Sequence, residues 1–272
     1  VAVGDEAGTA ITTGDSNVAV GFNALKTEDG NGFNVAVGAE ALETQNAGAD
    51  AYNVAVGRAA GKATTTGINN TLLGGLAGAA LTDADFNIAV GYGALDSDTL
   101  GSRSVAIGYN SLATQNFTTA TDTYNTAVGF QAGTAVTTGV QNTLIGGLAG
   151  SSLTDADFNT SVGRLALQTD TLGSRSTALG YGTLQAQNFT TATDSYNVAV
   201  GFSAGNALTT GLRNNLFGAF AGDSLTDADD NVAVGDSALN ADTLGSKSVA
   251  IGRGTLATQN FTTATDSYNT AA

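Results

Sequence analysis

A short apolar triplet closed by glycine recurs along the whole chain, as in "VAVG", "TLLG" and "VAIG". We call the closing residue the triplet glycine, and the segment from one triplet to the next a rung. From one triplet glycine to the next, the residue number rises by 17 in most intervals, by 19 in one and by 21 in two. The triplet glycines are Gly4, Gly21, Gly38, Gly57, Gly74, Gly91, Gly108, Gly129, Gly146, Gly163, Gly180, Gly201, Gly218, Gly235 and Gly252.

Four rungs together form a longer repeat, which is present in three full copies at residues 53–124, 125–196 and 197–268. Equivalent positions of successive copies therefore differ by 72 in number, and the fourth rung of each full copy is the longest. Residues 1–52 match a copy that lacks one rung, and residues 269–272 begin another copy. The loss of one complete rung indicates that the rung is the structural unit. We therefore expect a single continuous repetitive domain over residues 1–272.

Both ends of the sequence fall inside the repeated motif, with "VAVG" at the start and "NTAA" at the end. We interpret the chain as a mature product or a fragment of a longer one.

This period predicts an all-β fold, a parallel β-solenoid (β-roll) of about fifteen rungs. A unit as short as one rung cannot bury a core alone, so the rungs must stack on one another. Helical repeats need longer units, and glycine with β-branched residues fills the centre of this motif. Each triplet should pair with its equivalents at about 4.8 Å, which gives a rod on the order of 70 Å long.

Both faces of each triplet strand are apolar. Neighbouring residues on a strand point to opposite faces, and the positions of Ala19 and Val20 are both apolar in nearly every rung. Such a strand is expected to be buried on both sides. One face would line the core, and the face of Ala19 and Leu72 would need a further layer, either a return strand or another chain. We favour another chain.

Three further positions repeat in register with the triplet. The third residue after the triplet glycine is small, as in Ala24, and the fourth is only Gly or Leu, as in Gly61 and Leu95. These residues should allow close backbone approach at a corner and fill the end of the core.

Asparagine stands four residues before the glycine, with Ser in every fourth rung of the full copies, and stacked Asn side chains can hydrogen-bond along the axis. The predicted structural ladder is Asn17, Asn34, Asn53, Asn70, Asn87, Asn125, Asn142, Asn159, Asn197, Asn214 and Asn231.

Composition and charge remove several function classes. The chain has no His, Cys, Met, Pro or Trp, so the commonest general base and metal ligand and the thiolate nucleophile are missing. A formal charge of −15 has the wrong sign for binding nucleic acid or an anionic membrane surface. No apolar run reaches the roughly 20 residues of a membrane-spanning helix. We expect no catalysis, no nucleic-acid partner and no membrane insertion of this segment.

The repeated residues resemble a known family. The segment "SVAIGYNSL" from Ser104 resembles the head repeats of YadA-like trimeric autotransporter adhesins, and "NTAVGFQAG" from Asn125 is similar to repeats of phage tail-fibre proteins and related bacterial surface proteins. The resemblance covers essentially the whole chain. It implies a left-handed parallel β-roll, a homotrimer, and attachment to a surface receptor or glycan. The longer rung and the insertion in every fourth rung depart from the adhesin pattern.

The motif "TDADFN" at residues 82–87 resembles the start of a calcium loop, because carboxylates at alternate positions can converge on one cation. It recurs at residues 154–159 and, as "TDADDN", at 226–231. The glycine and the bidentate Glu of a complete calcium loop are missing, and Asp is also common in tight turns. Calcium is therefore one hypothesis, with the candidate ligands Asp83, Asp85, Asp155, Asp157, Asp227 and Asp229.

Every fourth rung of the full copies carries an insertion, "ATQNFTTATDTYN" in the first of them. Loops that recur along one edge are frequent contact sites in repeat proteins. The alternative is that each Phe of the loop packs back over the core. The candidate contact residues are Phe117, Tyr124, Phe189, Tyr196, Phe261 and Tyr268. Beside each loop, Arg103, Arg175 and Lys247 are expected to pair with Asp98, Asp170 and Asp242.

Three hypotheses for function follow. The chain is a structural and adhesive segment of an attachment fibre, located outside the cell, on a cell surface or on a virion. Alternatively, it is the subunit of a self-assembling extracellular filament, or a calcium-stabilised solenoid within a larger secreted protein. The first two require self-association, as a homotrimer or as a polymer.

Overall fold

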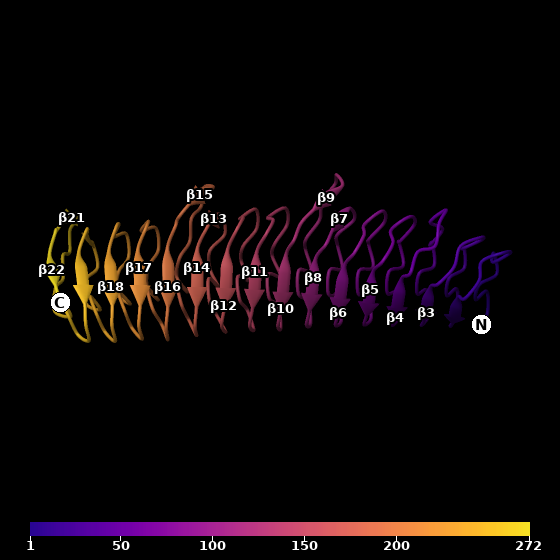
Figure 1. The fold of residues 1–272 in the computed structure, drawn as a ribbon, viewed down its shortest axis with the longest axis horizontal. Helices are drawn as coiled ribbons and strands as arrows, with labels where there is room; N and C mark the ends of the chain where they lie inside the picture. Colours follow the sequence, from indigo (N-terminus) through magenta and orange to yellow (C-terminus); the bar gives the residue numbers. More distant parts are fainter. The chain divides into compact units, whose positions relative to one another are not determined.

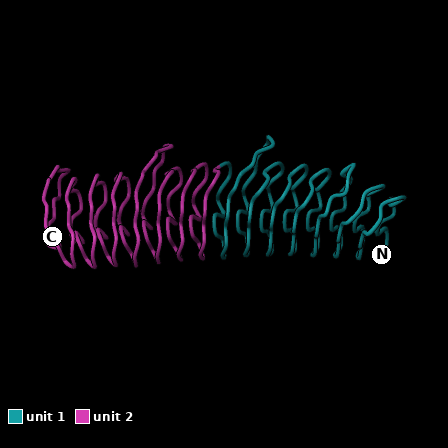
Figure 2. The backbone as a smooth tube through the Cα atoms, in the orientation of Figure 1, with its two compact units in different colours: residues 1–138 teal, residues 139–272 magenta.

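The computed structural model describes all 272 residues and confirms the predicted parallel β-solenoid, with no helix. The chain divides into two compact units, residues 1–138 and 139–272 (Figure 2). The division falls inside the copy at residues 125–196, so the units do not follow the copies defined by the sequence. No helix in the structure is long and apolar enough to span a membrane.

The first unit stacks eight short parallel strands in one sheet, with a separate pair of strands beside it (Figure 1). The main sheet contains β1 (Ala2–Val3), β2 (Val18–Val20), β3 (Val35–Val37), β4 (Val54–Val56), β5 (Thr71–Leu73), β6 (Ile88–Val90), β8 (Val105–Ile107) and β10 (Thr126–Val128). The separate pair is β7 (Gly101–Ser102) and β9 (Thr121–Asp122).

The second unit has the same architecture, with eight strands in its main sheet and two separate pairs. The main sheet contains β11 (Thr143–Ile145), β12 (Thr160–Val162), β14 (Thr177–Leu179), β16 (Val198–Val200), β17 (Asn215–Phe217), β18 (Val232–Val234), β20 (Val249–Ile251) and β22 (Thr270–Ala271). The pairs are β13 (Gly173–Ser174) with β15 (Thr193–Asp194), and β19 (Gly245–Ser246) with β21 (Thr265–Asp266).

The strands pair in strict register, so that equivalent residues of successive rungs form columns. Ala19 pairs with Ala36, and Ala36 pairs with Ala55. This register follows from the regular rung length, since a shift by one residue would turn every buried side chain outward.

The columns show which face of the triplet is inside. The central residue of each complete triplet is fully buried in the core of its own unit, as Ala19 and Leu72 are. The expectation that another chain covers their face is therefore wrong, because the opposite side of the same rung covers it. The two outer residues of the triplet point away from the core, and Val56 and Ile107 keep 39% and 37% of their surface exposed.

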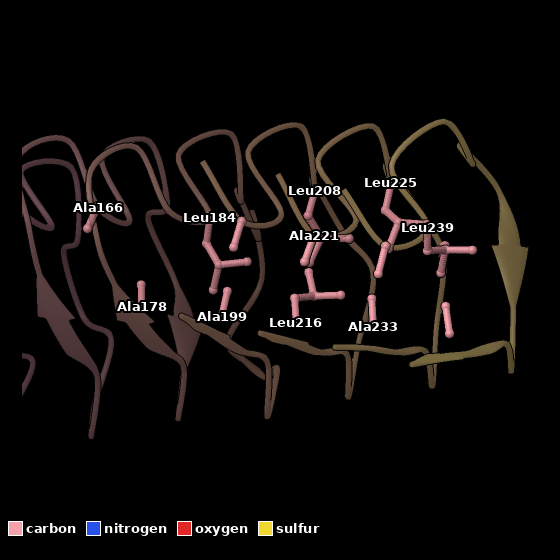
Figure 3. Packing of buried hydrophobic residues seen from close by; sticks show 14 of the residues in the cluster. Ala166, Ala178, Leu184, Ala199, Leu208, Leu216, Ala221, Leu225, Ala233 and Leu239 are labelled. Carbon is pink, nitrogen blue, oxygen red and sulfur yellow. The ribbon is translucent and has the colours of Figure 1, made fainter. Parts of the chain in front are cut away.

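The core of the second unit alternates large and small residues along its length (Figure 3). Leu216 occupies a triplet centre where neighbouring rungs have Ala199 and Ala233. Its extra volume lies over two glycines: a Cβ atom on Gly205 would be 2.7 Å from Leu216 Cδ1, and one on Gly222 would be 2.9 Å from Leu216 Cδ2. The Gly-or-Leu position of the sequence motif thus complements the size of the triplet centre.

The same position has a left-handed backbone. Leu239 has φ of 54° and Gly222 has φ of 57°. Glycine adopts this conformation without strain, whereas Leu accepts a cost of about 1–2 kcal/mol. Complete burial of the Leu side chain offsets that cost, since it contributes about 1.5–3 kcal/mol.

Candidate functional site

The asparagine column forms a ladder, and its bonds run from side chain to backbone. The Oδ1 atom of Asn53 accepts a hydrogen bond from the backbone N–H of Asn70 at 2.8 Å, and Asn53 Nδ2 donates to the carbonyl oxygen of Gly67 at 2.8 Å. The same pair of bonds recurs at Asn70 and at Asn214. The amide therefore ties each rung to the next and also closes its own rung, which satisfies buried backbone groups.

The serine in every fourth rung is matched by a hydroxyl in the insertion. Ser104 is too short to act as Asn does, and the N–H of Asn125 instead donates to Thr123 Oγ1 at 3.3 Å. Ser104 Oγ lies 2.6 Å from Thr123 Oγ1. The Ser of the fourth rung and the hydroxyl of the inserted loop therefore replace together the Asn side chain of the other rungs.

A buried carboxylate anchors the base of each inserted loop. Asp98 is fully buried, and its Oδ1 accepts bonds from the N–H groups of Gly101 at 3.1 Å and Phe117 at 3.0 Å. Its Oδ2 accepts a bond from Gln115 Nε2 at 2.5 Å, and the same nitrogen donates to Ser104 Oγ at 2.8 Å. We call this arrangement the Asp–Gln clamp. The sequence analysis did not find it, although the sequence shows Asp and then Gln seven residues after the triplet glycine in the third and fourth rungs of each full copy.

The clamp recurs with nearly the same geometry in both later copies. Gln187 Nε2 donates to Asp170 Oδ2 and Gln259 Nε2 donates to Asp242 Oδ2, each at 2.5 Å. These carboxylates are buried and bonded to Gln side chains and backbone N–H groups. The predicted ion pairs of Asp98, Asp170 and Asp242 are therefore wrong. The basic residues instead pair with loop carboxylates: Arg103 with Asp122 at 3.0 Å, Arg175 with Asp194 at 2.9 Å and Lys247 with Asp266 at 2.6 Å.

The aromatic residues of the loops separate into inner and outer groups. Phe117 and Phe189 pack back into the fold, each with 6% of its surface exposed, and Phe261 is half-buried. Tyr124, Tyr196 and Tyr268 are more than half exposed. Figure 1 shows the loops that carry β9 and β15 extending beyond the neighbouring turns. Of the six predicted contact residues, the three Tyr side chains are the most exposed.

The carboxylates of the calcium hypothesis bond to the preceding rung. Asp85 Oδ1 accepts from the N–H of Ile68 at 2.8 Å, and Asp83 Oδ1 accepts from Thr66 Oγ1 at 2.6 Å. Equivalent bonds hold Asp157, Asp227 and Asp229, and Asp155 is the equivalent of Asp83. The structure brings no three acidic side chains together in a group that would hold a metal ion. Calcium at these residues stays a prediction.

The outer face of each main sheet carries exposed apolar side chains. We define this outer face as the two outer residues of each triplet together with the residues one after and five before the triplet glycine. Every exposed large apolar side chain of the chain except Phe220 lies in these columns. The outer triplet positions contain no charged residue in any rung.

Aromatic rings flank the triplets on this face and stack along the axis. Ring centroids are 5.8 Å apart for Tyr92 and Tyr109 and 5.5 Å apart for Tyr109 and Phe130, with interplanar angles of 15° and 10°. In the second unit, Tyr181 and Phe202 stack at 5.2 Å. Tyr109 therefore stacks with a ring of the rung before it and a ring of the rung after it. The sequence shows the aromatic residues, but only the register of the rungs places them in contact.

Burial of acidic side chains contributes to the pH dependence of stability between pH 4.5 and pH 7. Burial raises the pKa of Asp170 and outweighs its bonds to Gln187 and to backbone N–H groups, which lower it. Burial also raises the pKa of Glu28, Asp96 and Asp223. A raised native pKa means that the folded state binds more protons than the unfolded state, so the stability that these groups contribute falls as pH rises.

We therefore expect the free energy of unfolding to be higher near pH 4.5 than at pH 7. The stability that these buried carboxyl groups contribute is fully present below the ordinary carboxyl pKa of about 4. It is lost as pH rises through their raised pKa values in the folded state. Chemical denaturation at a series of pH values measures it, and the variant Asp170→Asn should show a weaker dependence. Lower stability at pH 4.5 than at pH 7 would contradict this expectation.

The structure contains no pocket in either unit. No protein-family model matches the chain, and neither does any curated protein or any solved structure.

Proposed function

We propose that this chain is a structural segment of an extracellular or virion attachment fibre, and that copies of it associate through the outer face. The observation that carries the proposal is the strip of outer triplet residues on each main sheet, mainly Val, Ile and Thr, which has no charged side chain in any rung, although charged residues such as Arg58 and Arg164 interrupt its flanking columns. Soluble monomers rarely expose continuous apolar surface of this kind unless another surface covers it.

The size of the strip suits an interface. Three residues of about 3.3 Å each, over eight rungs of about 4.8 Å, make an area on the order of 400 Å² per unit for the triplets alone. The two flanking columns, which carry the stacked aromatic residues, add about 250 Å² by the same arithmetic. The total of about 600 Å² is three quarters of the roughly 800 Å² that each partner contributes to a standard protein interface.

Another copy of the chain suits this strip better than a glycan does. Sugars bind aromatic side chains through the open faces of the rings, whereas Tyr109 stacks with both Tyr92 and Phe130, and Phe202 contacts both Tyr181 and Phe220. A sheet face with in-register columns of Val, Ile and Thr is instead suited to interdigitate with a second such face. Tyr124 and Tyr196 stand five residues before a triplet glycine, so they belong to the outer face, and the proposed association would cover them.

Light scattering after size exclusion tests the proposal, because it measures the mass in solution against the 26.8 kDa of one chain. We expect an integer multiple, threefold for a trimer, and a lower multiple for the double variant Ile107→Lys/Ile145→Lys, which places a charge on the outer face of each unit. The matched control is Thr119→Lys/Thr191→Lys, on exposed loop positions, and should leave the mass unchanged.

The other outcomes separate the hypotheses. A folded monomeric wild-type chain would overturn self-association. Open polymers of high mass would favour a filament subunit over a closed oligomer. A mass that falls when calcium is chelated would support a structural calcium ion at Asp83 and Asp85.

A further inference from the structure

The shortened copy at residues 1–52 contains an altered Asp–Gln clamp. Glu28 stands where the full copies have Asp98, Gln45 stands in place of Gln115, and Asn34 stands in place of Ser104. All three side chains are fully buried. One polar atom of each has no hydrogen-bond partner in the protein: Glu28 Oε2, Asn34 Nδ2 and Gln45 Nε2. Half of the buried unpaired side-chain atoms of the chain therefore belong to this clamp.

Hydrogen bonds from Asn53 determine the orientation of the side-chain amides of Asn34 and Gln45. Asn53 Nδ2 donates to Gln45 Oε1 at 2.9 Å, and the backbone N–H of Asn53 donates to Asn34 Oδ1 at 3.2 Å. Exchanging the oxygen and nitrogen positions of either amide would set a donor against a donor. The unpaired atoms of Asn34 and Gln45 are therefore N–H donors.

The carboxylate of Glu28 is held on one side only. Its Oε1 accepts bonds from the backbone N–H and from Nδ2 of Asn31, both at 3.1 Å, which leaves Oε2 unpaired. In the full copies the equivalent groups bond directly, since Gln115 Nε2 donates to both Asp98 Oδ2 and Ser104 Oγ. Here the serine acceptor is replaced by an amide donor, and the longer Glu side chain is drawn toward Asn31. In the altered clamp, Gln45 Nε2 therefore bonds neither to the carboxylate of Glu28 nor to the side chain of Asn34.

We propose that these three groups bind one buried water molecule. The water accepts hydrogen bonds from Asn34 Nδ2 and Gln45 Nε2 and donates one to Glu28 Oε2. Three bonds to otherwise unpaired buried groups are typical of an internal water in proteins. This inference concerns the interior of the first unit and does not depend on the proposed function.

The chemistry of the site excludes other small occupants. Two N–H donors repel a cation, and an ionised carboxylate repels an anion. The pKa of Glu28 is raised by burial, and a hydrogen bond donated to Oε2 stabilises its charged form. A water molecule both donates and accepts hydrogen bonds, so it is the one occupant that satisfies all three groups.

The test is a high-resolution crystal structure of the full chain, together with ¹⁷O magnetic relaxation dispersion, which counts long-lived internal waters in solution. We expect a density peak within about 2.7–3.2 Å of all three atoms. The double variant Glu28→Asp/Asn34→Ser restores the residues of the full copies, so it should lose this peak and one long-lived water. It should also gain a direct bond from Gln45 to the shortened carboxylate.

The reverse exchange supplies the control. Asp98→Glu/Ser104→Asn installs the altered clamp in a full copy and should add one long-lived water. The proposal is overturned if the wild-type crystal shows no peak, or if the peak persists unchanged in Glu28→Asp/Asn34→Ser. A peak that gives the anomalous signal of bromide after soaking would also overturn it, because the occupant would then be an anion. If the double variant fails to fold, the wild-type crystal and Asn34→Ser alone decide.

Discussion

Replacing Gly146 by Ala is expected to lower the free energy of unfolding by more than about 3 kcal/mol, because it combines backbone strain with a steric clash. Gly146 has φ of 133°, a conformation that side-chain-bearing residues rarely adopt. A Cβ atom at this position would lie 2.6 Å from both the carbonyl carbon and the carbonyl oxygen of Gly163 in the next rung. Backbone atoms on a paired strand cannot move aside without breaking the register. Denaturation by guanidinium chloride, monitored by circular dichroism, measures the loss.

The adjacent glycine provides the control. A Cβ atom on Gly147 meets nothing within 4 Å, and its φ lies outside the left-handed region. Gly147→Ala should therefore range from neutral to about 1 kcal/mol stabilising, through the lower entropy of the unfolded chain. Equal losses for the two variants would show that the triplet glycine column does not require glycine.

Leu216→Ala is expected to destabilise the chain by about 2–5 kcal/mol, because it removes a fully buried side chain that fills the space over Gly205 and Gly222. Leu179, at an outer and half-exposed triplet position, is the control, and Leu179→Ala should cost less than about 1 kcal/mol. The same denaturation experiment measures both variants.

A double variant tests whether the two positions are complementary. Leu216→Ala/Gly222→Leu places at these two positions the residues of the neighbouring rung, where Ala233 is the triplet centre and Leu239 is buried with φ of 54°. Leu225 Cδ1, 2.8 Å from a Cβ atom at residue 222, still crowds the new side chain. We expect the double variant to be more stable than the sum of its single variants by about 1 kcal/mol or more. Additive effects would show that the two positions pack independently.

The sequence alone determined the repeat, the rung and the ladder. Regular spacing of the triplet glycines requires equivalent residues to stack, so Ala19 lies beside Ala36 and Asn53 beside Asn70, as predicted. The same spacing revealed that one rung is missing from residues 1–52. These features follow from periodicity, which a single sequence displays in full.

Only the tertiary structure decided which side of each column is inside and which atoms meet across rungs. The period-two alternation of a strand does not distinguish Ala19 from Val20 as the core residue when both are apolar, and the return path of the rung buries Ala19. The partners of Asp98 were likewise beyond the sequence. Arg103 is close in sequence, but a buried carboxylate satisfied by Gln115 and two N–H groups lies where that guanidinium does not reach. Side-chain direction depends on the backbone conformation of each corner, and residue spacing contains no information about it.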